Sequence, residues 1–388
     1  MSSIFSHHEG DPIAKDEKKV EYLELIYDLI FVYVIGRNNS LLHNVEDGFV
    51  PVTVFLAYVL GSLAIIQIWN FSTFYINMHG RNSLRDHVFL FINMYLLYYI
   101  GEGTRLHWET FQNQYHIVWA LILINIGVQY AIELKNHWGE PVEGRSTRNM
   151  MIILFGEALL ILICIPLYNR TGVQLAAIPI LYGIILTRVL NDGSRAELID
   201  FPHLTERAML YVVFTFGEMI IVIASYFEGE FTLNSVYFSL LCFLIVVGLF
   251  LCYELLYDRI IDREMKTTGI SYMIIHLFLI FALNCITTSL EFMRDTEVAL
   301  WPKILFLTAS FVICFVCMIA LQLYAKNGVG LCRRYVGSMV VITAVFVGLM
   351  IVFRENMRVN ILVSVLYVAA MFLRIYRYSK VAQIADNL

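Results

Sequence analysis

Residues 21–36 read EYLELIYDLIFVYVIG, an apolar run that begins a membrane-spanning helix and still carries Glu24 and Asp28. A helix crosses a hydrocarbon layer of ~30 Å with about 20 apolar residues. Residues four apart lie on one face of a helix, so the two acids point the same way. A charged residue at the centre of a spanning helix costs about 2.5–3.5 kcal/mol. We therefore predict that the acidic face points into the protein rather than at lipid.

The composition of the rest of the chain is that of a polytopic membrane protein. It has 388 residues, of which 59% are hydrophobic and 15% are charged, against about 25% charged residues in average soluble domains. The net charge is -5 and there is no basic block, so nucleic acid is excluded as a partner. The lipid bilayer is the predicted partner. The first twenty residues lack the apolar core of a signal peptide, so we expect no cleavage.

Hydropathy divides the chain into twelve predicted helical spans, which makes the fold an all-α transmembrane bundle. The spans are expected to begin near residues 22, 51, 84, 115, 149, 173, 207, 235, 271, 302, 334 and 359. Twenty of the 27 Lys and Arg residues fall on the side of the N-terminus. Because cytoplasmic loops are enriched in Lys and Arg, both termini are predicted to be cytoplasmic, in the plasma membrane.

An internal repeat accompanies the span count. His87 and His276 each begin an apolar run, each is followed fifteen residues later by a glutamate, and they are offset by 189 residues. A similar offset sets Asp28 opposite Glu218. We predict two parallel six-helix repeats, residues 21–195 and 196–380, with cytoplasmic tails 1–20 and 381–388. A homo-oligomer is among the expected assemblies. Several transporter folds share this plan, with repeats related by an axis along the membrane normal.

Four acids at membrane depth are the candidate site for a proton, an ion or a small solute. Because acids facing lipid are costly, we expect them to line a polar interior between the halves. The alternative is that they are structural and are paired with an arginine such as Arg37 or Arg188. The candidates are Glu24, Asp28, Glu157 and Glu218.

Further polar residues are predicted to support that site. Histidine titrates near physiological pH, so His87 and His276 are candidates for gating or proton passage, with an interfacial position as the alternative. Arg188 is a candidate partner for an acid. Asp258 belongs to an acidic face that could hold a cation, although its arginine neighbours favour an exposed helix end with ordinary ion pairs.

Signatures of soluble enzymes are missing from the sequence. It has no H-E-x-x-H, no G-x-S-x-G and no G-x-x-x-x-G-K-[ST]. Seven cysteines lie mostly in apolar runs, and the spacing of Cys314 and Cys317 favours packing over metal or redox chemistry. We predict no metal and no cofactor, and an enzyme is the less favoured class.

Several motifs resemble the bacterial low temperature requirement protein A family. The stretch ELIYDLIFV at 24–32 resembles the opening of that family, and ER at 206–207 and FGE at 216–218 resemble later elements. LYD at 256–258 and His276 with its downstream glutamate also fit. Where the family has a Trp pair, this sequence has Tyr253 and Glu254. The resemblance implies an integral protein of the cell membrane, and it implies no substrate.

The leading hypothesis from the sequence is a secondary transporter or proton-linked permease that uses Asp28 and Glu218. An alternative is a membrane-embedded enzyme acting on a lipid or lipid-linked substrate through Glu254, Asp258, His276 and His87. A third class, a sensor or scaffold, predicts acids neutralised by arginine.

Overall fold

Twelve α-helices form the protein in the computed structural model, which describes residues 18–104, 108–191, 193–224, 226, 232–293, 297–326 and 332–386. The described part contains no β-strand, in agreement with the all-α prediction. The predicted N-terminal tail lies outside the described residues up to position 17. The helices are α1 (Tyr22–Asn38), α2 (Val52–His79), α3 (Leu84–Gly103), α4 (Trp108–Asn136), α5 (Glu143–Thr171), α6 (Ala177–Leu190), α7 (Phe201–Ala224), α8 (Leu233–Leu255), α9 (Ile270–Phe292), α10 (Leu300–Leu321), α11 (Arg333–Val352) and α12 (Met357–Asp386).

Nine of the described helices are long and apolar enough to cross a membrane. The other three, α1, α3 and α6, fall short in length or hydropathy, since α1 has 17 residues and α6 has 14. Helix α1 falls short in length, and its two acids, Glu24 and Asp28, lie inside the protein rather than facing outward. The chain is therefore a multi-pass helical membrane protein, with a helix at each predicted span.

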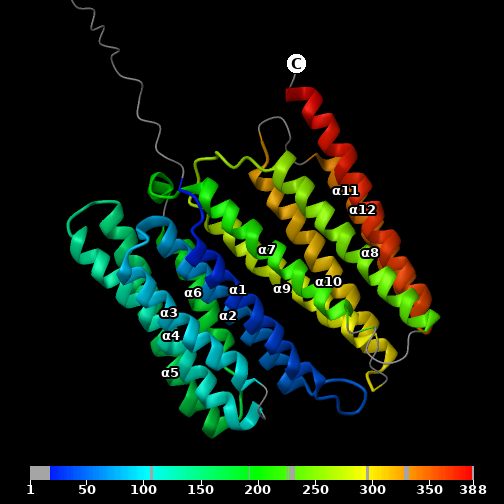
Figure 1. Ribbon diagram of the computed structural model, residues 1–388, viewed down its shortest axis with the longest axis horizontal. Helices are drawn as coiled ribbons and strands as arrows, with labels where there is room; N and C mark the ends of the chain where they lie inside the picture. The colour runs from blue at the N-terminus through cyan, green and yellow to red at the C-terminus, as the bar shows by residue number, and fades with distance from the viewer. Residues whose placement is uncertain are drawn as a thin grey trace, which may run out of the picture.

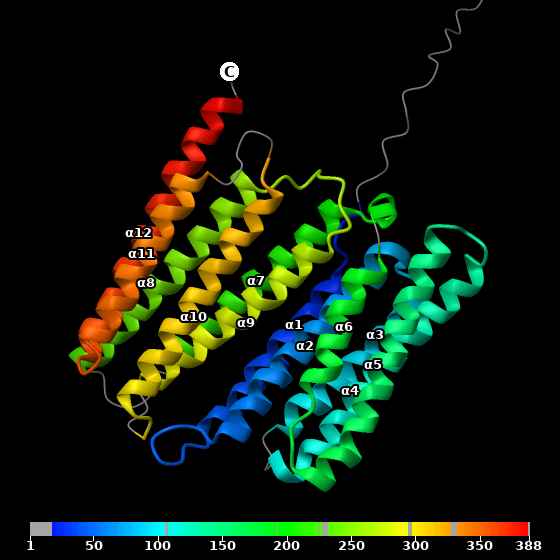
Figure 2. The same cartoon turned by 180° about the vertical axis from the view of Figure 1, so that it is seen from behind.

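The two halves of the chain lie side by side, with α1–α6 on one side and α7–α12 on the other (Figures 1 and 2). Helices α1 and α2 pack against α7 and α9 where the halves meet. The beginning of α1 and the end of α12 lie at the same end of the bundle (Figure 1). We call it the inner end, and its cytoplasmic location stays a prediction.

Packing follows a similar order in the two halves. Helix α1 packs on α3 as α7 packs on α9, and α5 packs on α6 as α11 packs on α12. The halves also differ, because α4 packs extensively on α5 while α8 packs extensively on α12. The predicted duplication stays a prediction.

One helix boundary changes the interpretation of the sequence. Helix α7 begins at Phe201, six residues before the predicted start at Arg207. Arg207 therefore lies within the helix rather than at its end, and Glu218 lies farther from the inner end than expected. The prediction placed the start of the span at Arg207 because charged residues such as Glu206 and Arg207 usually mark the end of a membrane-spanning helix. Only the buried acids of α1 explain why Arg207 lies inside the helix.

Candidate functional site

Four charged or titratable side chains meet where α1 packs on α7, and we call them the inner charge cluster: Glu24, Asp28, His203 and Arg207. Glu24 Oε2 lies 3.1 Å from Arg207 Nη1 and 3.2 Å from His203 Nε2. Asp28 Oδ2 accepts a hydrogen bond from Arg207 Nε at 3.3 Å, and Asp28 Oδ1 accepts one from Nη2. The i, i+4 spacing of the acids on α1 matches the i, i+4 spacing of their partners on α7. One arginine thus bridges both acids.

Helix α2 completes the surroundings of the cluster. Trp69 Nε1 donates to Asp28 Oδ1 at 2.8 Å, so both oxygens of this carboxylate are bound. Asn77 lies beside His203, with its Nδ2 3.0 Å from the ring Nδ1. The Asp200 N–H donates to Asn77 Oδ1 at 3.1 Å, which turns the Asn77 amide nitrogen toward the histidine. His203 Nδ1 therefore accepts, and in the neutral ring Nε2 carries the proton toward Glu24.

The charges in the cluster cancel only if His203 is protonated. All four side chains are buried, with exposures of 4% for Glu24, 0% for Asp28, 1% for His203 and 0% for Arg207. With neutral His203, two carboxylates face one guanidinium, which leaves one negative charge. Both oxygens of Asp28 are bound by Arg207 and Trp69, whereas Glu24 contacts the remaining Arg207 nitrogen, Nη1, and the His203 ring. Glu24 therefore has fewer contacts that stabilise its charge than Asp28 has.

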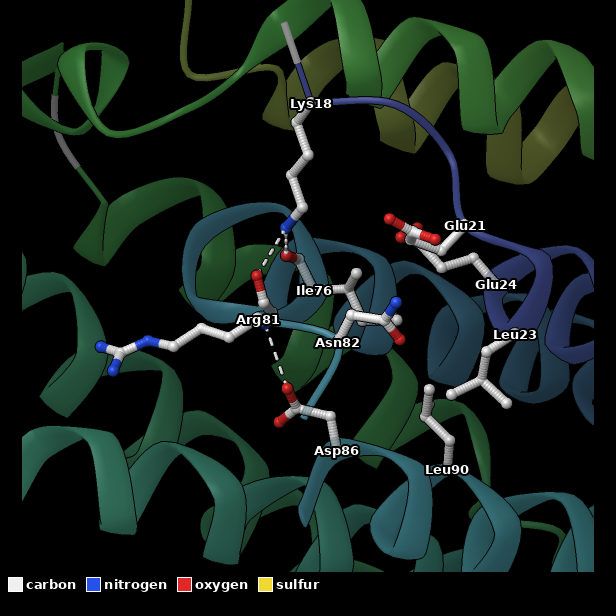
Figure 3. Close-up of a pocket in the computed structure, with 10 residues that line it drawn as sticks. Lys18, Glu21, Leu23, Glu24, Ile76, Arg81, Asn82, Asp86 and Leu90 are labelled. Carbon is white, nitrogen blue, oxygen red and sulfur yellow. Dashed lines mark hydrogen bonds between the residues drawn. The ribbon is translucent and has the colours of Figure 1, made fainter. Parts of the chain in front are cut away.

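A pocket of about 180 Å³ at the inner end reaches Glu24 (Figure 3). Glu21 and Glu24 lie together in its wall, and Asp86 lies across from them (Figure 3). Lys18 Nζ donates to the carbonyl oxygens of Ile76 and Gly80, at 3.0 Å for Gly80. Burial lowers the pKa of Lys18. The pocket is therefore lined by the acids Glu21, Glu24 and Asp86 together with Lys18.

A larger cavity of about 730 Å³ also has Lys18 in its lining. Asn77, Asp200 and Glu264 contribute to its lining. Since Asn77 contacts His203 and Glu24 contacts the same ring, the histidine lies between residues that line the two cavities. The inner charge cluster is thus buried, but Glu24 lines one cavity and Asn77, which contacts His203, lines the other.

Glu157 on α5 is a second buried acid with different surroundings. It is 0% exposed, and Gln67 Nε2 donates to its Oε2 at 3.4 Å. Among the described residues no cation pairs with it, and its Oε1 has no hydrogen-bond partner. A Cβ added at Gly183 would lie 2.1 Å from Glu157 Oε2, so the glycine makes room for the carboxyl. Because an unpaired buried charge is costly, this site suits a protonated carboxyl.

Glu218 lies apart from Asp28. A Cβ added at Gly36 would lie 2.6 Å from Glu218 Oε1, which places this acid beside the end of α1. Gly36 is eight residues beyond Asp28, or about 12 Å along the helix. Glu218 is also only half-buried. The structure therefore does not bring the two acids together, because Glu218 lies beside the far end of α1.

The supporting residues are dispersed. His276 is buried, with Nε2 3.0 Å from the Tyr253 hydroxyl and Nδ1 2.9 Å from the Tyr272 carbonyl oxygen. His87 is half-buried and its Nδ1 binds the Ser83 carbonyl at 2.8 Å. Arg188 and Asp258 are exposed. In the described part of the chain, none of these residues joins a His, Cys, Asp and Glu cluster close enough to hold a metal ion.

The motifs that meet in the inner charge cluster are those of one family. A family model described as bacterial low temperature requirement A protein matches residues 19–372. The chain belongs to the bacterial low temperature requirement A family. No curated protein and no solved structure matches the chain. In this member of the low temperature requirement A family, the acids of the opening motif at 24–32 contact the arginine of ER at 206–207.

Sequence reasoning missed Arg207 and His203 as site residues. Both lie on α7 at i and i+4, the spacing already noted for Glu24 and Asp28. Two buried acids spaced i and i+4 on one helix require basic partners with the same spacing on a neighbouring helix. A search for basic residues spaced i and i+4 in another apolar helix could therefore have identified His203 and Arg207.

Proposed function

We propose that the protein is a secondary transporter or proton-linked permease in which Glu24 is the proton-exchanging acid. Support comes from the unequal charges of the inner charge cluster, together with the pocket that reaches Glu24. Uptake of one proton by Glu24 makes the cluster neutral and weakens the attraction between Glu24 and Arg207. Since Glu24 and Arg207 lie on helices from different halves, protonation changes the contact between the halves.

Asp28 has the role of a fixed anchor in this proposal. Its carboxylate holds Arg207 in place whether Glu24 is charged or neutral, because Arg207 and Trp69 bind it at the same time. Glu157 and Glu218 are proposed to take part elsewhere on the solute path, with Glu157 as a neutral group. Arg188 lies at the exposed inner end of α6, where it is proposed to act on arriving solutes.

The enzyme hypothesis receives less support. It required Glu254, Asp258, His276 and His87 to converge, but Glu254 and Asp258 are exposed, His276 is buried, and His87 lies on the other half. The sensor hypothesis fits Asp28, which has an arginine partner. It does not fit Glu157, which has no cation among the described residues.

The test is proton movement in proteoliposomes that contain a pH-sensitive dye. Pools of sugars, amino acids, nucleosides and inorganic ions are added outside, and the lumenal pH is followed. We expect at least one pool to change the lumenal pH with the wild type, and the change to be lost in Glu24→Gln. Glu254→Gln removes an exposed inner-end acid and serves as the matched control. The proposal fails if no pool moves protons or if Glu24→Gln behaves as the wild type.

A further inference from the structure

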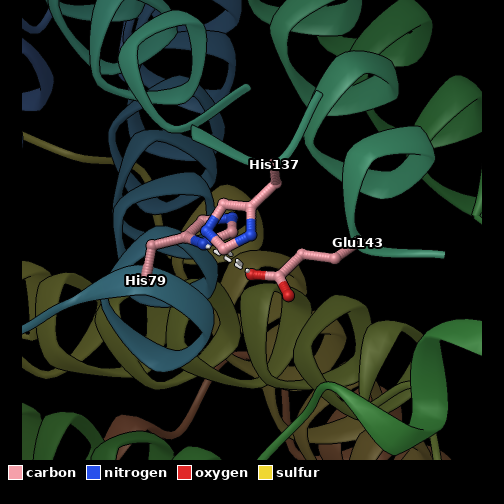
Figure 4. Close-up of side chains that lie close together, drawn as sticks. All are labelled: His79, His137 and Glu143. Atoms are coloured by element: carbon pink, nitrogen blue, oxygen red, sulfur yellow. Dashed lines mark ion pairs between the residues drawn. The ribbon is translucent and has the colours of Figure 1, made fainter. Parts of the chain in front are cut away.

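A second group of titratable side chains lies at the inner end, outside the inner charge cluster. His79 ends α2, His137 follows α4, and Glu143 begins α5 (Figure 4). His79 Nδ1 and His137 Nε2 each lie 3.4 Å from Glu143 Oε1. One potential ligand atom from each residue lies within 4.8 Å of the other two. We propose that these three residues bind a divalent transition metal ion, with Zn²⁺ as the best fit.

The distances match the geometry of such a site. Zinc binds imidazole nitrogen and carboxylate oxygen at about 2.0–2.2 Å in a tetrahedral arrangement, which places neighbouring ligand atoms roughly 3.3–3.5 Å apart. Both nitrogen-to-oxygen separations fall in that range. Two histidines and one glutamate are also a ligand set found in zinc sites that keep a fourth position open.

The second nitrogen of each ring has a neighbour suited to orient it. His79 Nε2 lies 3.2 Å from Thr147 Oγ1, and His137 Nδ1 lies 3.3 Å from Glu140 Oε1. A hydrogen bond such as the one between His79 and Thr147 fixes the tautomer and the ring orientation in metal sites. Neither ring nitrogen of His137 has a hydrogen bond of suitable geometry among the described residues, although both are buried. A bound cation would satisfy Nε2.

Access and charge also suit a cation. His79 is buried, but 18% of the His137 side chain and 25% of the Glu143 side chain are exposed, so an ion can enter from the inner end. Glu133 Oε2 lies 3.8 Å from His137 Nε2, but Arg85 binds that carboxylate through its other oxygen. Glu133 is therefore an electrostatic neighbour rather than a ligand. The metal would join the ends of α2, α4 and α5 within the N-terminal half.

The experiment measures zinc binding to the purified full chain in detergent. Equilibrium dialysis with Zn²⁺ is followed by elemental analysis for the wild type, His79→Gln, His137→Gln and Glu143→Gln. His87→Gln, which changes a histidine at the same end of the bundle, is the matched control. We expect one Zn²⁺ per chain for the wild type and the control, and an affinity at least about tenfold lower in the three ligand variants.

Thermal unfolding provides a second measurement that separates ligand loss from misfolding. Saturating Zn²⁺ should raise the Tm of the wild type and of His87→Gln, because a ligand that binds the native state stabilises it. The Tm of a folded ligand variant should not change. Absence of zinc from the wild type, or equal binding by the wild type and all three ligand variants, would overturn the proposal. Proton flux has no bearing on this result, so it is independent of the proposed transport.

Discussion

Asp28 and Glu157 are both 0% exposed, yet the protein accommodates them in opposite ways. Asp28 has a guanidinium and an indole N–H as partners. Glu157 has one side-chain amide at 3.4 Å and no cation among the described residues. The comparison shows that burial alone does not say whether a membrane acid is charged, and that the partner decides it. Asp28 suits a carboxylate and Glu157 suits a carboxylic acid.

The largest effect is expected from Arg207→Met, which leaves Glu24 and Asp28 buried without their cation. Removing one partner of a buried ion pair costs about 3–5 kcal/mol, so the yield and the Tm in detergent should fall strongly. The triple variant with Glu24→Gln, Asp28→Asn and Arg207→Met has no unpaired charge and should recover much of the loss. Equal losses in the single and triple variants would argue against the pairing.

Trp69→Phe should come next, because it removes the indole donor to Asp28 while keeping an aromatic ring against Tyr211. Loss of a hydrogen bond to a charged group costs about 1.5–3 kcal/mol. Trp119→Phe is the matched control, since Trp119 is buried and its Nε1 has no hydrogen-bond partner in the described part of the chain. The Tm of Trp69→Phe should therefore be lower than the Tm of Trp119→Phe. Equal Tm values would contradict a charged Asp28 that is bound by the Trp69 indole.

Gly183→Ala tests the room made for Glu157. The new methyl group would lie 2.1 Å from Glu157 Oε2 and 2.2 Å from Gln67 Nε2, and such overpacking costs about 1–3 kcal/mol. Gly337→Ala on α11 is the control, because nothing lies within 4 Å of its added Cβ. A Tm for Gly183→Ala that matches the control would show that the ends of the Glu157 and Gln67 side chains are free to move away from Gly183.

Glu157→Gln should have the smallest effect. If the acid is neutral, an amide of the same shape replaces it at a cost below about 1 kcal/mol. Asp28→Asn leaves Arg207 facing Glu24 alone and should lower the Tm more. The comparison between the two acids would be wrong if Glu157→Gln were the more destabilising of the two substitutions.

Much of the fold follows from hydropathy, because a spanning helix needs a long apolar run whatever it packs against. A helix lies at each of the twelve predicted spans, and Glu24, Asp28 and Glu157 are buried as predicted. The side chains that pair with these acids could not be predicted from hydropathy. Arg207 is 179 residues from Asp28 in sequence, and only the packing of α1 on α7 brings them together.

The prediction that Asp28 and Glu218 act together rested on the repeat offset. An offset aligns positions between two halves but does not place them in contact. The cluster of His79, His137 and Glu143 was missed for a related reason, since its members come from three helix ends and carry no shared motif.

Infrared difference spectroscopy of the reconstituted protein tests the central claim most directly. Spectra in acidic and alkaline buffer are compared for the wild type, Glu24→Gln and Glu157→Gln, so that exposed acids common to all three cancel. The account predicts a protonated-carboxyl band that changes with pH in the wild type and in Glu157→Gln and is lost in Glu24→Gln. A pH-dependent band that survives in Glu24→Gln and disappears in Glu157→Gln would contradict it.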